Sequence, residues 1–206
     1  MAIELTAAQP ERVIAAVLLS AAAGSDFDRR AQLAVSWPPG ALGSLLGALM
    51  DTEADRRHTS ARDRAAFRRS MFGAFAQSAQ HPLHMVQTVR CIAKSDPSPP
   101  LLHIMRDNGI PTIVVHGERD RIIPWINAEN MAHAAGAALY QVPNAHHSWM
   151  IANPSDGADA FAQLMKDELG AAVRGARRRL GIRDDGPQAW EQTCLTPGLL
   201  AFDLIS

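Results

Sequence analysis

The sequence has little cysteine. Cys91 and Cys194 are its only two cysteines in 206 residues, and their spacing matches no metal site. Two isolated cysteines do not form the disulfide framework of a small secreted domain, so that class of protein is excluded. We expect no metal site and no cofactor.

The sequence also lacks an apolar run of membrane-spanning length. The longest run, Val13–Ala23, is well short of the ~20 residues that a transmembrane helix needs. It resembles a secretory signal in ending on small residues, but Glu4 and Glu11 remove the positive excess that should precede such a core. We therefore expect a cytoplasmic protein in which this run is a buried strand.

No sign of charge predominates. The chain has 20 Lys and Arg against 21 Asp and Glu, a formal net charge of −1, which argues against nucleic acid or an anionic membrane as the main partner. With 47% hydrophobic and 20% charged residues, the composition is that of a soluble globular domain. Residues 61–76 have apolar residues at helical intervals and carry four arginines, at 62, 64, 68 and 69. These arginines are compatible with binding of an anionic substrate, but we expect a solvated helix face.

The pattern of apolar residues predicts strands and helices in alternation. Val13–Leu19 is aliphatic without polar alternation, as in a strand covered on both faces. Residues 29–105 have helical periodicity interrupted by prolines. Three further elements follow, a strand over Ile110–Gly117, an amphipathic helix over Trp125–Ala137 and a strand over Ala138–Val142, and a last long helix opens at 153–154.

Two polar loops follow the last two predicted strands. A strand–helix–strand unit over 110–142 places both strand ends at one edge of a parallel sheet, where α/β folds build their sites. The first loop contains Asp120, and the second contains His146 and His147. A carboxylate that binds the imidazole Nδ1 leaves Nε2 as a base for a hydroxyl or a water molecule.

Other interpretations of these residues remain open. Asp120 is also well placed to cap the turn into the next helix, and paired histidines are common in loops without a catalytic role. Glu118 and His116 are within reach as a different acid and base.

The loops resemble those of the α/β-hydrolase family. The stretch G-x-x-D-x-x-x-P from Gly117 to Pro124 is similar to the family's seventh strand with its acid, and P-N-A-H-H-S at 143–148 is similar to its histidine loop, usually P-x-x-G-H. The resemblance assigns Asp120 as the acid and His147 as the catalytic histidine, with His146 in place of the glycine. Residues 2–20 are similar to the helix after the nucleophile and the sixth strand.

The resemblance implies an α/β class and a partial α/β-hydrolase fold, covering about residues 1–169. The expected core consists of residues 1–28 and 106–180, with three parallel strands, the sixth to the eighth of the family, and flanking helices. Residues 29–105 take the position of the family's helical lid, and residues 181–206 are a tail of unknown structure.

One part of the family pattern is missing. The nucleophile should lie in a G-x-S-x-G elbow, whose backbone also supplies part of the oxyanion hole. No serine of this sequence has that context, and the similarity begins just after it. We therefore expect a hydrolase of ester-like small molecules whose acid and histidine are present but whose nucleophile is not, so that the 206 residues alone are inactive or truncated.

The alternative is a non-catalytic chain that binds a partner or another half of the fold. The strand over Val13–Leu19 would then leave an apolar sheet edge that favours self-association. A water-activating reaction that uses His147 alone is a third interpretation.

Overall fold

A parallel three-stranded sheet lies at the centre of the structure, a computed structural model that describes residues 2–29, 54–55, 64–65, 67–69, 73, 87, 91 and 97–181. The strands are β1 (Ala16–Leu19), β2 (Thr112–Gly117) and β3 (Ala138–Val142), in the order β1-β2-β3. Both neighbouring pairs are parallel. This architecture confirms the predicted partial α/β fold with three parallel strands.

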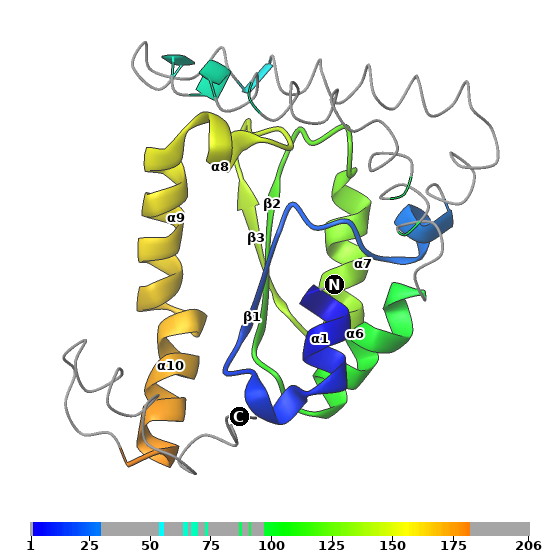
Figure 1. Cartoon of the computed structure of the whole chain (residues 1–206), viewed down its shortest axis with the longest axis vertical. Helices are drawn as coiled ribbons and strands as arrows, with labels where there is room; N and C mark the ends of the chain where they lie inside the picture. The colour runs from blue at the N-terminus through cyan, green and yellow to red at the C-terminus, as the bar shows by residue number, and fades with distance from the viewer. Residues whose placement is uncertain are drawn as a thin grey trace.

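Helices cover both faces of the sheet (Figure 1). On one face lie α1 (Ala2–Ala8), α6 (Ser98–Asp107) and α7 (Trp125–Ala135); on the other lie α8 (Trp149–Ala152), α9 (Pro154–Lys166) and α10 (Glu168–Arg179). A short 3-10 helix, η1 (Pro10–Arg12), joins α1 to β1. The α7 connection carries the chain back to the sheet edge at which β2 begins, so β3 runs parallel to β2. The loops that follow the two strands are therefore neighbours at the carboxyl edge.

The strand side chains divide between two apolar clusters, one on each face. Val114 packs with α1, α6 and α7, whereas Ile113 and Val115 pack with Trp149 and Leu164. All six residues of β2 are buried. This two-sided burial explains the unbroken β-branched run of the sequence, since no position of the strand faces water.

The proline cluster before β2 marks the start of a helix. The sequence predicts a break between helices at Pro97–Pro100, and α6 begins there, at Ser98, with prolines in its first turn, where the missing N–H of a proline costs no intrahelical hydrogen bond. Leu102 and Met105 of α6 are 0% exposed in the core. Residues 98–105 therefore pack with the core, although the sequence assigned them to the lid. The rest of the domain division stays a prediction, because most of residues 29–105 and all but Gly181 of the tail lie outside the described residues.

The C-terminal part also differs in detail. The single long helix that the sequence predicts is divided at Asp167, whose φ of −96° and ψ of −129° are not helical. Gly170 permits the close approach of the last turn of α9, because an added Cβ would overlap the Met165 carbonyl oxygen. The Tyr140 hydroxyl donates to the Glu168 carboxylate, which raises the pKa of Tyr140 to about 12 and joins β3 to α10.

None of the helices in the described residues combines the length and the apolar character that crossing a membrane requires.

Leu102 offers a test of the packing between α6 and the sheet. Leu102→Ala should lower the free energy of unfolding by about 2–5 kcal/mol, because it leaves a cavity in a filled core. Urea denaturation measures the loss. Leu5→Ala is the matched control, since Leu5 is 64% exposed, and equal losses for the two variants would contradict the packing described.

Gly117, at the end of β2, offers a second test. A Cβ at this position would lie 2.5 Å from the His146 carbonyl oxygen and 2.6 Å from that of Ala145. Because backbone atoms cannot easily move aside, Gly117→Ala should destabilise the fold by about 1–3 kcal/mol. Gly175→Ala is the control: its nearest neighbour is the end of an arginine side chain at 3.6 Å, so the helix should gain up to about 1 kcal/mol. A Gly117→Ala protein as stable as the parent would be inconsistent with this approach.

Candidate active site

The loops after β2 and β3 are joined by hydrogen bonds at the carboxyl edge of the sheet. The Arg119 N–H donates to the Ala145 carbonyl at 2.8 Å. The Glu118 carboxylate accepts the N–H of Asn144 at 2.8 Å, where the chain turns through a positive φ of 59°. Glu118 thus holds the turn of the second loop, which is a structural role rather than that of the alternative acid.

The buried carboxylate of Asp120 binds its own loop with one oxygen. Oδ1 accepts the N–H groups of Ile122 at 2.9 Å and Ile123 at 2.8 Å. These bonds close the turn that leads into α7 and fix the carboxylate plane. Asp120 therefore caps this turn with Oδ1, as one interpretation of the sequence proposed.

The other oxygen of Asp120 faces His147. Its Oδ2 lies 2.9 Å from Nδ1 of the imidazole. The Asp120 side chain is 0% exposed, whereas that of His147 is 32% exposed. With the carboxylate ionised, Nδ1 carries the proton and donates it, so the ring presents Nε2 for chemistry. The structure thus brings together the two residues that the sequence predicts as a pair.

His116 lies beneath this pair and is 0% exposed. Its Nε2 is 2.7 Å from the Ile123 carbonyl oxygen and 3.4 Å from Asp120 Oδ2. Because a carbonyl can only accept, Nε2 carries the proton and donates to it. The ring also meets Trp125 edge-on at 6.1 Å between centroids. A buried imidazole with its Nε2 proton so engaged supports the Asp120 loop and is poorly placed as the alternative base.

His146 is buried too, at 6% exposure, and its neighbour is a residue that the sequence did not single out. Asp55 accepts the backbone N–H of His146 on Oδ1 and that of Ser148 on Oδ2, both at 2.8 Å. The His146 Nδ1 lies 3.3 Å from Asp55 Oδ1. His146 therefore lies against Asp55, which belongs to residues 29–105, the insert that is predicted as a lid, and next to the position that the resemblance assigns to catalysis.

Burial raises the pKa of Asp55, and the two backbone N–H groups and the His146 ring oppose that rise. Asp55 lies in the segment predicted as a lid. Its partners are backbone groups 91 and 93 residues away. No local motif marks such a contact, so sequence reasoning had no signal for it.

The described residues include no group of three or more His, Cys, Asp or Glu side chains arranged to hold a metal ion. Cys91 is a free, exposed thiol. The arginines at 64, 68 and 69 are exposed, in keeping with a solvated helix face. The contact between Asp120 and His147 supports the chemistry of an oriented imidazole, whose acid holds it in one tautomer while the other nitrogen can exchange a proton.

Comparison with known proteins gives one sequence relative and two similar structures. A protein of Mycobacterium phage D29 with the provisional name non-heme haloperoxidase is 32% identical over 169 residues, which are 81% of this chain and 60% of the relative. The structure of Rv0554 from Mycobacterium tuberculosis is 20% identical, with a TM-score of 0.48 over 82% of this chain and 61% of that one. BpoC of Mycobacterium tuberculosis, provisionally a non-heme bromoperoxidase, is 15% identical, with a TM-score of 0.43 over 83% and 63%. No protein-family profile matches the chain.

The chain thus spans about 60% of the length of the curated relative that it matches. Haloperoxidases of this non-heme type have the α/β-hydrolase fold. The same fold accounts for the parallel strands, the helices on both faces and the neighbouring acid and histidine loops. In sequence and in fold, the chain is similar to the α/β-hydrolase family.

Proposed function

We propose that this chain carries the acid and the base of a nucleophile–histidine–acid triad that hydrolyses a small ester or a related acyl compound. In this proposal Asp120 is the acid, His147 is the base, and the nucleophile comes from residues outside the 206. Neither a metal nor a cofactor takes part. Catalysis by a hydroxyl nucleophile needs no further group beyond donors for the oxyanion.

The observation that carries the proposal is the 2.9 Å contact between Asp120 Oδ2 and His147 Nδ1. A fully buried carboxylate against a partly exposed imidazole is the arrangement that orients a catalytic histidine and stabilises its protonated form. The backbone N–H groups on Oδ1 hold the carboxylate in place while the imidazole changes charge.

The reaction follows from this geometry. The imidazole Nε2 takes the proton of the nucleophile hydroxyl as its oxygen bonds to the acyl carbon. The imidazolium then gives that proton to the leaving alkoxide as the carbon–oxygen bond breaks. Water, deprotonated by the same Nε2, then attacks the acyl intermediate. The imidazolium returns this proton to the nucleophile oxygen as its bond to the acyl carbon breaks, which releases the acid and regenerates the hydroxyl. Asp120 stays ionised throughout and offsets the positive charge of the ring.

The sequence contains no G-x-S-x-G elbow to supply the nucleophile. Without a nucleophile and oxyanion donors, a base and an acid give little rate enhancement. The phage relative is longer than the similarity, which covers 60% of it, so that relative has further residues on which a nucleophile can lie. Its provisional name concerns haloperoxidase activity, so a peroxide and bromide assay belongs beside the ester assay.

His147→Ala tests the proposal. The 206-residue chain should hydrolyse a p-nitrophenyl ester no faster than the uncatalysed rate. A chain extended upstream in the same reading frame through a G-x-S-x-G segment should hydrolyse it, and His147→Ala in that chain should lower kcat at least about 10³-fold, because the base is lost. His103→Ala, on the exposed side of α6, is the control that should change nothing.

Two results would refute the triad. One is an upstream frame without the elbow; the other is ester turnover by the extended chain that His147→Ala leaves unchanged. Robust turnover by the 206 residues alone, abolished by His147→Ala, would instead refute the external nucleophile.

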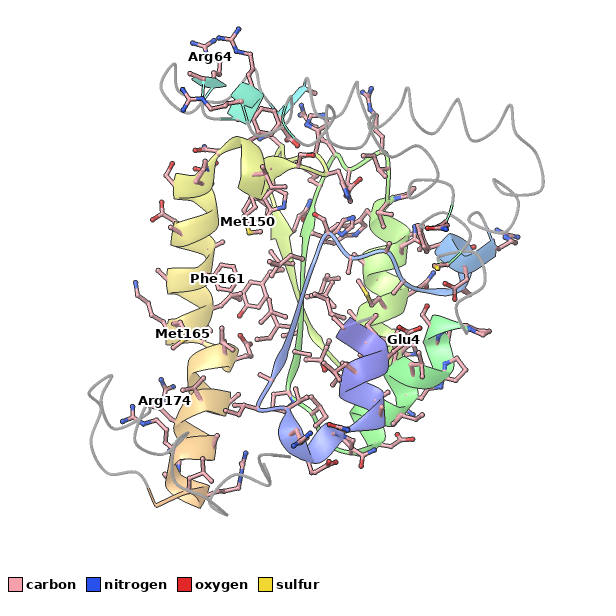
Figure 2. All side chains as sticks on the ribbon, viewed as in Figure 1. Glu4, Arg64, Met150, Phe161, Met165 and Arg174 are labelled. Atoms are coloured by element: carbon pink, nitrogen blue, oxygen red, sulfur yellow. The ribbon has the colours of Figure 1, made fainter. Side chains whose placement is uncertain are left out.

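One observation favours the second candidate function, a non-catalytic chain that binds a partner. Within the described residues β1 pairs only with β2, so its outer edge offers unpaired backbone groups. Phe161 and Met165 on α9, labelled beside the sheet in Figure 2, are 37% and 46% exposed. Self-association through this edge should give a concentration-dependent dimer in light scattering, and a monomer at all concentrations would count against it.

A further inference from the structure

The Asp55 carboxylate spans the backbone on both sides of His147. One oxygen accepts the N–H of His146 and the other that of Ser148, each at 2.8 Å. The Asp55 side chain is 4% exposed, so water competes little for these bonds. A single buried side chain thus binds the residues immediately before and after the histidine.

These two bonds restrict the direction in which His147 points. The N–H of Ser148 belongs to the rigid peptide plane directly after His147, and the N–H of His146 belongs to the plane between Ala145 and His146, one residue earlier. With these two planes held by one side chain, only the φ and ψ angles of His146 and His147 lie between them, which restricts the direction of the His147 Cα–Cβ bond. Asp120 then fixes the ring at Nδ1, so two carboxylates hold the residue, one through its backbone and one through its side chain.

A carboxylate is a costly choice at this position if packing were its only purpose. Burial disfavours the charged form, as the raised pKa of Asp55 shows. An apolar side chain would fill the space without that cost, but it would leave two buried N–H groups without an acceptor. A carboxylate therefore suits this position because it accepts the two N–H groups of the histidine loop, which an apolar side chain of the same size cannot do.

We propose that Asp55 is a positioning residue for His147, through which the 29–105 insert sets the orientation of the imidazole toward Asp120. The consequence for catalysis rests on the proposed function, whereas the orientation of the ring does not. The orientation of the imidazole is therefore tested by observing the ring itself in the 206-residue chain.

Nuclear magnetic resonance of ¹⁵N-histidine-labelled protein at low temperature detects the His147 Nδ1–H that Asp120 holds. Asp55→Asn keeps the size of the side chain but replaces one carboxylate oxygen by an NH₂ group. One of the two backbone N–H groups then faces a donor and loses its hydrogen bond. We expect this Nδ1–H to exchange with water about tenfold faster or more, the scale of one hydrogen bond, with His133 unchanged. Asp159→Asn, at an exposed position of α9, should leave the signal as in the parent.

A purely structural Asp55 would lower the free energy of unfolding of the Asn variant without altering the ring signal, and that result would overturn the proposal. If Asp55→Asn does not fold, amide exchange in the unsubstituted chain decides: the N–H groups of His146 and Ser148 should be protected, and unprotected exchange would overturn it. Absence of ester turnover leaves these readouts unaffected, so failure of the proposed function is distinguishable.

Discussion

The site depends on the hydrogen bonds of one buried carboxylate, that of Asp120. One oxygen closes the turn into α7 through the N–H groups of Ile122 and Ile123, and the other contacts His147 at 2.9 Å. Because the turn fixes the carboxylate, the histidine meets a rigid acceptor rather than a mobile one. His116 lies below and donates to the Ile123 carbonyl, so the acid is supported from the core as well as from its own loop.

This geometry requires the two loops to lie very close together. Gly117 allows the approach, because any Cβ there would strike the carbonyl groups of the histidine loop, and the Arg119 N–H bonds directly to that loop. Asp55 adds a constraint from the opposite side, by holding the backbone around His147. The loop after β2 and Asp55 therefore both hold His147, one through its side chain and the other through the backbone on either side of it.

Local patterns predicted the parallel sheet and the neighbouring positions of Asp120 and His147, since a βαβ unit must bring two strand ends to one edge; their catalytic roles stay a prediction. The prolines before β2 predicted a break between helices, and α6 begins at that break because prolines are accepted in a first turn. The break at Asp167 depends on one residue's dihedral angles. Asp55 could not be found, because its partners are distant backbone N–H groups that carry no side-chain identity.

The most direct test of the account is the coupling energy between Asp120 and His147. Urea denaturation of Asp120→Ala, His147→Ala and the double variant forms a double-mutant cycle, which removes the effects that each substitution has alone. A buried, charge-assisted hydrogen bond predicts a coupling of about 1–3 kcal/mol at neutral pH. Effects that add to within about 0.5 kcal/mol would contradict the claim that this pair organises the site.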